Sequence, residues 1–129
     1  MATIDFGNLP AGACPMPYDD GKVMLWTFDM TGLAATADVD GRGLHLRYRS
    51  VMQFPAPAAK VQLTVLAGTN ADVTAWILSG DGYRIADTRA LASSPRPQNV
   101  SFQVPGLVRI STEANNELFL TVLTIEKEV

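Results

Sequence analysis

The stretch VQLTVLAGTNADVTAWILSGDGYRIAD, residues 61–87, decides the fold. Two runs in it alternate apolar and polar side chains, and a third run begins near its end. This period of two is that of a half-buried β-strand. The runs are separated by Gly68-Thr69-Asn70 and Ser79-Gly80-Asp81-Gly82. Because glycine accepts a positive φ and aspartate bonds to turn amides, the stretch predicts a β-meander of consecutive paired strands.

Similar runs of alternating or β-branched residues occur along the rest of the chain. They span residues 3–6, 22–28, 44–50, 83–89, 99–104, 107–112 and 117–126. Pro105-Gly106, a pair favoured in a type II turn, predicts a hairpin between residues 99–104 and 107–112. The last run is expected to be the longest strand. No segment has a convincing helical period, although residues 30–37 have room for one short helical turn.

These patterns predict an all-β chain with roughly eight to ten short strands. The economical arrangement is an antiparallel two-sheet β-sandwich of the jelly-roll type. With 129 residues, the chain has the size of one domain and can bury a single core. We therefore predict one β-sandwich domain over residues 1–129.

Charge and composition exclude several classes of function. The formal net charge is only −3, and the lysine and arginine residues are scattered, whereas nucleic-acid binding needs clustered positive charge. Cys14 is the only cysteine, so neither an internal disulfide nor a cysteine-rich metal site is expected. No apolar run reaches the length of a membrane span. The first residues lack the features of a signal peptide, which predicts an intracellular protein or one exported by another route.

Several parts of the chain share the pattern of a known class of module. They are the opening IDFGNLPAG with Tyr18 and Gly21, FPAPAAKVQLTVLAG, SGDGYRIAD, and the closing NVSFQVPGLVRISTEANNELFLTVLTIE. Together they cover most of the chain, as patterns of strands and turns. The sequence resembles bacterial jelly-roll modules of the galactose-binding-like, carbohydrate-binding-module type. This resemblance implies a non-catalytic binding domain.

Such modules commonly hold a structural calcium ion, bound by an acidic residue after the opening IDF and by an acidic pair in the last strand. Here Gly7 and Thr121-Val122 stand at those positions. Because Ca²⁺ requires several oxygen ligands with negative charge among them, no cofactor is expected there. Backbone carbonyls of residues 12–21, with Asp19 or Asp20, would form an alternative calcium site.

Two other patterns bear on possible chemistry. Residues 38–43 carry aspartate and glycine at three positions of an EF-hand loop, but Arg42 and Arg49 occupy positions where acidic ligands belong. A turn with solvated carboxylates is the better interpretation. The one histidine, His45, lies near Arg47 and Arg49, whose charges oppose formation of an imidazolium. No catalytic residue is therefore predicted.

Candidate ligand-binding residues are of two kinds. His45, Arg47 and Arg49 alternate along residues 44–50 and are expected on one outward face. They would suit an anionic sugar, a phosphate or an acidic partner. The alternative is a solvated face whose charges pair with carboxylates of neighbouring strands.

The second kind is aromatic: Trp76, Tyr83 and Tyr18. Trp76 alternates away from Val73 and Ala75, so it is expected on the outer face. Sugar rings stack on flat aromatic side chains, and such platforms occur on sheet faces and loop tips. Burial under a loop is the alternative for Trp76, and more so for Trp26.

We therefore predict a binding module for a carbohydrate or a similar polyhydroxylated ligand, without nucleic-acid partner. The alternative is a structural protein that self-associates as a homo-oligomer or docks on a protein partner through a sheet face. Apolar residues expected on outer faces separate the two hypotheses, because monomers rarely expose large apolar patches. These residues are Met24, Trp26, Leu66, Leu78, Leu123 and Ile125.

Overall fold

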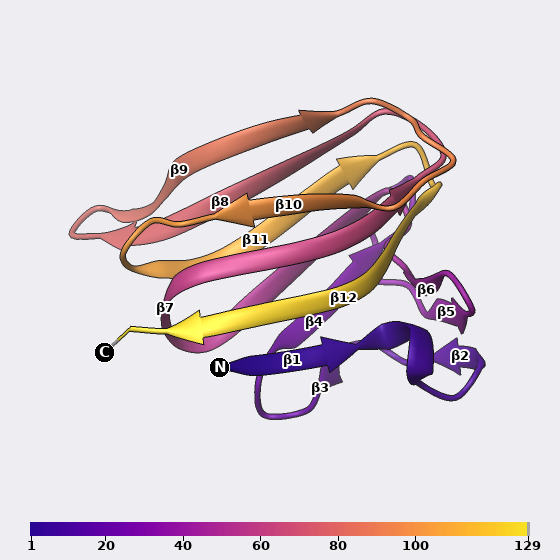
Figure 1. Ribbon diagram of the computed structural model, residues 1–129, viewed down its shortest axis with the longest axis horizontal. Coiled ribbons are helices and arrows are strands. Elements are labelled where there is room, and N and C mark those ends of the chain that lie inside the picture. The colour runs from indigo at the N-terminus through magenta and orange to yellow at the C-terminus, as the bar shows by residue number, and fades with distance from the viewer. Residues whose placement is uncertain (129) are drawn as a thin grey trace.

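A computed structural model describes residues 1–128 and shows a chain built almost entirely of β-strands (Figure 1). The first half contains β1 (Ala2–Asp5), a 3-10 helix η1 (Phe6–Asn8), β2 (Gly12–Cys14), β3 (Tyr18–Asp19), β4 (Met24–Phe28), β5 (Ala37–Asp40) and β6 (Gly43–His45). The second half contains β7 (Arg49–Ala67), β8 (Ala71–Ser79), β9 (Gly82–Leu91), β10 (Gln98–Phe102), β11 (Leu107–Ala114) and β12 (Leu118–Lys127). No helix in this part of the chain is long and apolar enough to cross a membrane.

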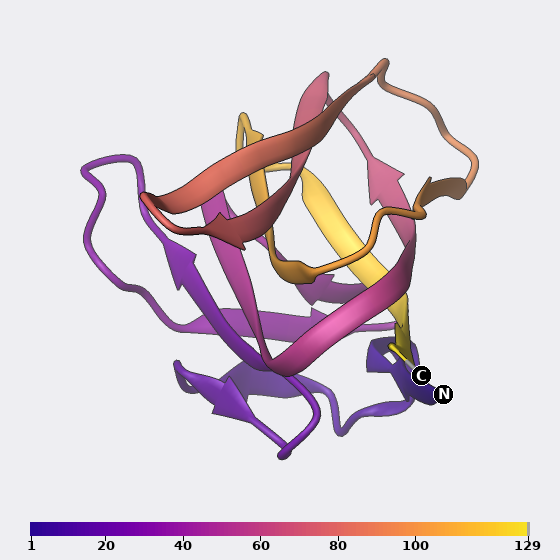
Figure 2. The same cartoon turned by 90° about the vertical axis from the view of Figure 1, so that its left-hand side faces the viewer.

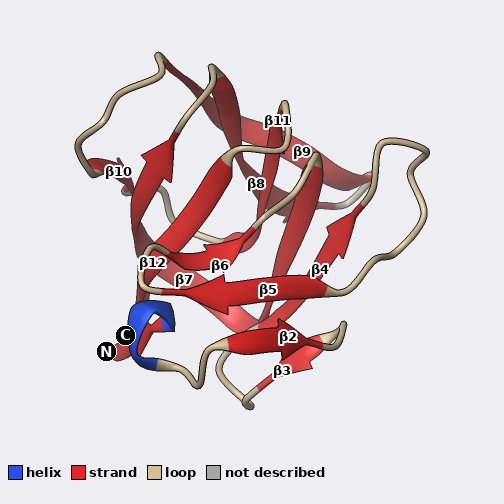
Figure 3. Ribbon diagram, turned by 90° about the vertical axis from the view of Figure 1, so that its right-hand side faces the viewer, coloured by secondary structure: helices blue, strands red, loops and turns tan. Residues whose placement is uncertain are grey.

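The strands form two layers that share β7. Residues 49–53 of β7 lie between β4 and β11, in a sheet ordered β3-β4-β7-β11-β8-β9, here called the first sheet. Residues 61–67 lie between β12 and β10, in a second sheet ordered β2-β5-β6-β12-β7-β10. β1 pairs with β12 beside β6. Figure 3 shows β5 and β6 side by side in this second sheet. All these strand pairs are antiparallel, which confirms the predicted jelly-roll sandwich. Figure 2 shows β7 turning from one layer to the other.

The core lies between the two layers. Leu25, Met52 and Ile110 face it from the first sheet, and Leu63 and Leu123 from the second, all without exposed surface. Burying such side chains is the main driving force for folding, at about 25 cal/mol per Å² of apolar surface. Side chains alternate along a strand, so every second residue of these strands points away from the core. Once the core residues are buried, the residues on the outer faces are therefore determined.

The predicted meander is wrong at its first reversal. β7 and β8 do not pair: residues 61–67 belong to the second sheet, whereas β8 pairs with β11 and β9 in the first. Gly68-Thr69-Asn70 therefore carries the chain from one layer to the other. The second reversal is confirmed, because β8 and β9 form a hairpin closed at Ser79 and Gly82. Periodicity identifies a half-buried strand, but it does not identify the strand beside it.

The predicted hairpin around Pro105-Gly106 is also wrong. Gly106 has a φ of 82°, which agrees with the expected turn. The strands on its two sides separate, however, because β10 pairs with β7 in the second sheet and β11 lies between β7 and β8 in the first. β7 is the longest strand with 19 residues, and β12 has only ten.

Local predictions fail at three further places. Residues 44–50 do not form one strand, because Arg47 adopts a positive φ of 57° between β6 and β7. Residues 30–37 form no helical turn, and the 3-10 helix is η1, whose first turn Asp5 caps through a 3.0 Å bond from the Gly7 amide. The described chain has twelve strands, more than expected, because β2 and β3 are too short for a periodic signal.

Candidate functional site

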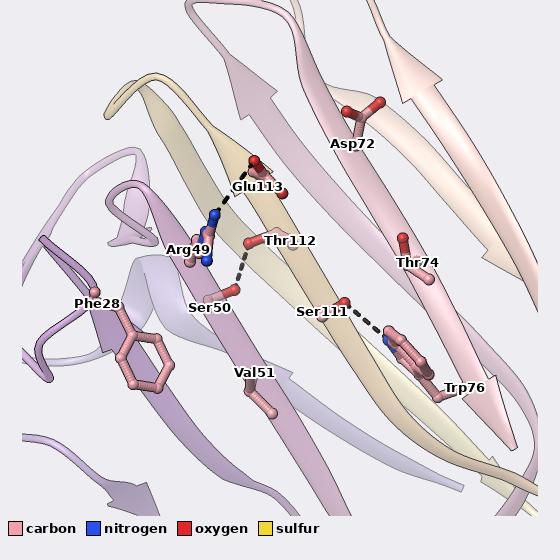
Figure 4. Close-up of a pocket in the computed structure, with 11 residues that line it drawn as sticks. Phe28, Arg49, Ser50, Val51, Asp72, Thr74, Trp76, Ser111, Thr112 and Glu113 are labelled. Carbon is pink, nitrogen blue, oxygen red and sulfur yellow. Dashed lines mark hydrogen bonds and ion pairs between the residues drawn. The ribbon is translucent and has the colours of Figure 1, made fainter. Parts of the chain in front are cut away.

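A groove of about 460 Å³ lies on the outer face of the first sheet (Figure 4). Strand alternation brings Val51 of β7, Ser111 of β11 and Thr74 of β8 to its floor. Phe28 of β4 and Trp76 of β8 lie at opposite sides. Arg49, Glu113 and Asp72 line it at the end nearer the start of β8. We call this surface the sheet groove.

Trp76 is held in one orientation within the sheet groove. Its indole Nε1 donates a hydrogen bond of 2.9 Å to the Ser111 Oγ on the neighbouring strand. The side chain is half-buried, so part of the ring remains open to a ligand. Fixing an aromatic ring before binding removes part of the entropy cost of ordering it later. Trp76 therefore provides a preformed flat surface.

A row of three charged side chains crosses the groove on neighbouring strands. Glu113 lies directly opposite Arg49 on one side and opposite Asp72 on the other. The Arg49 Nη2 to Glu113 Oε1 distance is 3.8 Å, and the two side chains are 64% and 67% exposed, so their attraction is weak. Asp72 has no ion pair within residues 1–128. The row thus carries two carboxylates for one guanidinium.

The groove rests on a well-packed base. Directly beneath its floor, the buried hydroxyl groups of Ser50 and Thr112 are hydrogen-bonded to each other across β7 and β11. At the Phe28 side, the Asp29 carboxylate accepts hydrogen bonds from the Thr31 hydroxyl and the Thr31 and Leu33 amides. These bonds, the Thr31 hydroxyl first, lower the pKa of Asp29. The loop after β4 is therefore shaped by a carboxylate that stays ionised at neutral pH.

Beyond Trp76, the same outer face carries a second ordered group. The Arg109 guanidinium lies 3.8 Å from the centre of the Tyr83 ring, and its Nε donates to the Gln53 Oε1 at 3.0 Å. Gln53 in turn donates to the Tyr83 hydroxyl at 3.4 Å. Tyr83 is 45% exposed, but it lies outside the lining of the sheet groove.

Of the six residues proposed from the sequence, the groove brings Trp76 and Arg49 together. The predicted basic stripe is not formed, because the chain leaves the strand conformation at Arg47. His45 instead stacks on Phe119 at 4.8 Å, and its Nε2 lies 2.6 Å from the carbonyl oxygen of Asn116. The Arg47 Nη1 reaches the carbonyl of Thr36 at 3.5 Å.

Tyr18 also lies apart from the groove. It pairs with the inward-facing Leu25, and its ring meets Phe6 edge-on at 5.3 Å. Its hydroxyl donates to the Asp20 Oδ2 at 3.0 Å. Burial first, and then the Asp20 carboxylate, raise the pKa of Tyr18 to about 12. This side chain therefore faces the core side of the first sheet.

Sequence reasoning missed several groove residues, namely Phe28, Val51, Asp72, Thr74, Ser111 and Glu113. Thr74 and Ser111 stand at the outward phase of strands that the sequence predicts, whereas Val51 and Glu113 lie just beyond the predicted strands 44–50 and 107–112. What the sequence does not give is the neighbour of each strand. Without knowing which strands are neighbours, Glu113 and Asp72 are two unrelated charges in distant parts of the sequence.

A second hollow, of about 430 Å³, lies on the second sheet next to His45. Phe119 stands in it with the Arg42 guanidinium 4.0 Å from its ring centre. Asn116 also lines it, and its Oδ1 is buried without a hydrogen-bond partner. No cluster of three or more histidine, cysteine or acidic side chains suited to a metal occurs in residues 1–128.

Neither a protein-family model nor a curated protein matches the chain. Among solved structures, it is similar to a carbohydrate-binding module from Clostridium stercorarium in complex with cellobiose (11% identity, TM-score 0.45, covering 98% of this chain and 94% of that one). It is also similar to a carbohydrate-binding module from Cellvibrio mixtus lichenase 5A in complex with cellotriose (13% identity, TM-score 0.43, covering 99% of this chain and 98% of that one). A third is a family 29 carbohydrate-binding module (10% identity, TM-score 0.44, covering 98% of this chain and 91% of that one). They are of the class that the sequence resembles.

Proposed function

We propose that the chain is a non-catalytic module that binds carbohydrate in the sheet groove. The observation that supports this proposal is Trp76, an aromatic ring fixed by Ser111 at the side of an open groove. The apolar face of a sugar ring stacks on such a surface, while its hydroxyl groups need polar partners at the rim. Ser111 and Thr74 supply hydroxyl groups near the ring, and the charged row lies at the far end of the groove.

The size of the groove suits this role. Its volume of about 460 Å³ falls within the range of small-molecule sites. The proposal assigns no catalytic group. His45, the only histidine, is bound to the Asn116 carbonyl on the other sheet, where it cannot act on a ligand at Trp76.

Binding to a glycan array, measured with calcium and again with a chelator, tests the proposal. Trp76→Ala should weaken binding at least about tenfold, because an aromatic side chain on which the ligand stacks carries much of the affinity. Leu78→Ala is the matched control: Leu78 lies two residues along β8 on the same outer face, is 61% exposed and does not line the groove. It should bind as the unaltered protein does.

Two results would count against the groove. One is full glycan binding by a Trp76→Ala protein whose circular dichroism shows a native fold. The other is an array with no signal for the unaltered protein. Binding lost with the chelator would instead point to a calcium-dependent module, because the groove as described needs no metal.

A second candidate function is self-assembly, which one observation favours. Leu78, Tyr83 and Ile85 are 61%, 45% and 58% exposed and lie together at the β8–β9 hairpin. Two of the residues on which the assembly hypothesis depended, Leu123 and Ile125, lie in the core and are 0% and 4% exposed. Light scattering across a wide concentration range tests the idea. Assembly would be favoured if the measured mass rose with protein concentration and if the Ile85→Lys variant kept the mass of a monomer.

A further inference from the structure

The charged row of the sheet groove places two carboxylates at directly opposed positions, an arrangement that folding alone does not explain. Glu113 and Asp72 stand directly opposite each other on β11 and β8. Opposed side chains of an antiparallel pair have Cβ atoms about 5 Å apart, and like charges in this position destabilise a sheet. Both carboxylates point out of the first sheet at the same end of the groove (Figure 4).

Nearby positive charge does not neutralise this pair. Arg49 reaches only Glu113, at 3.8 Å and with both side chains largely exposed. Arg109, the next cation on β11, is turned away from the groove, because its guanidinium lies over Tyr83 and its Nε donates to Gln53. Asp72 has no ion pair among the described residues. The lining of the groove therefore carries one positive and two negative charges.

From this arrangement we propose that the sheet groove selects glycans that carry protonated amino groups over neutral glycans, and both over glycans that carry carboxylates. The inference rests on the proposed function, since the sugar chain must first lie against Trp76. An ammonium group between Asp72 and Glu113 relieves their repulsion and donates hydrogen bonds to both. A uronate at the same place meets two like charges.

The spacing along β8 also sets a minimum ligand length. Asp72 and Trp76 are four residues apart on one face of the strand, which corresponds to about 14 Å. The ammonium group and the ring stacked on Trp76 therefore belong to different sugar units. The groove requires an oligosaccharide, and a single amino sugar gains little from it.

The test compares oligosaccharides of equal length by isothermal titration calorimetry at low salt and at a mildly acidic pH that keeps the glucosamine amines protonated. The probes are a β-1,4-linked glucosamine oligomer, its N-acetylated counterpart, a glucose oligomer with hydroxyl in place of amine, and a galacturonic acid oligomer. The glucosamine oligomer should bind about three- to tenfold more tightly than either neutral one, as expected for exposed charge pairs. Raising the salt concentration should reduce this preference.

Matched variants locate the effect. Asp72→Asn and Glu113→Gln should each lower the ratio of glucosamine-oligomer affinity to glucose-oligomer affinity, because each removes one of the two carboxylates that attract the ammonium group. Asp38→Asn is the control, because Asp38 is an exposed carboxylate on β5, in the second sheet, and its loss changes the net charge by the same amount. It should retain the full preference.

The outcomes separate this inference from the proposed function. Equal binding of neutral and amino oligomers, tighter binding of the galacturonic acid oligomer, or an equal loss of preference with Asp38→Asn would overturn the selectivity and leave the module intact. No binding of any oligomer would overturn the proposed function and the selectivity together. Loss of all binding with Trp76→Ala, with selectivity altered only by the groove carboxylates, would support both.

Discussion

Replacing Gly43 by alanine should severely destabilise the sandwich. Gly43 is the first residue of β6, where the chain enters the second sheet beside β12. Its φ is 114°, a conformation that side chains with a Cβ rarely adopt. A Cβ built there would lie 2.6 Å from the carbonyl carbon of Leu120 and 2.9 Å from the Cα of Thr121. Both atoms belong to the main chain of β12.

The magnitude comes from these two effects. Holding a residue other than glycine in a rare backbone region costs about 1–3 kcal/mol. Overpacking costs about another 1–3 kcal/mol, and here the contacts are backbone atoms that no side-chain rotation can move. We therefore expect Gly43→Ala to lower the free energy of unfolding by about 3 kcal/mol or more. For a domain of this size, the melting temperature should fall by about 10 °C.

Thermal and urea unfolding followed by circular dichroism measure this loss, and a neighbouring glycine provides the control. Gly41 lies in the same turn between β5 and β6, its φ is not positive, and a Cβ there would meet no atom within 4 Å. Gly41→Ala should change stability by less than about 1 kcal/mol. If Gly43→Ala proved as mild as Gly41→Ala, the close approach of β6 to β12 would be wrong.

Three other predictions concern polar groups. Ser50→Ala or Thr112→Val should each lower the free energy of unfolding by about 1–3 kcal/mol, because each leaves a buried hydroxyl without its partner; the double variant should lose less than the sum in denaturant unfolding. Absorbance titration should give Tyr18 a pKa of about 12, lowered by Asp20→Asn. Since the unfolded phenol ionises near pH 10, the stability due to Tyr18 is present below pH 10 and is lost between pH 10 and 12. Asp72→Asn should raise stability by less than about 1 kcal/mol in thermal unfolding, since it removes a like-charge pair; a clear decrease would contradict this account of the row.

Part of the candidate site is accessible from the sequence because strand periodicity is local. Alternation predicts that Trp76 faces outward, away from Val73 and Ala75, and it does so in the sheet groove. Arg49 is also a candidate from the sequence, but as part of a basic stripe with His45 and Arg47. This stripe does not form, because the positive φ of Arg47 interrupts the strand. A single residue with positive φ interrupts the strand and changes the direction of the chain, and alternation gives no warning of this change.

The sequence by itself determined the class of fold, the outward phase of most strands and the turns at Gly80-Asp81, Gly41-Arg42 and Pro105-Gly106. These features depend on side-chain alternation and on the backbone preferences of a few residues, which act over short stretches. Only the tertiary structure decided that β11 lies between β7 and β8, and hence that Glu113 lies between Arg49 and Asp72. Strand order depends on how two layers pack their apolar faces together, and many orders satisfy the same alternation.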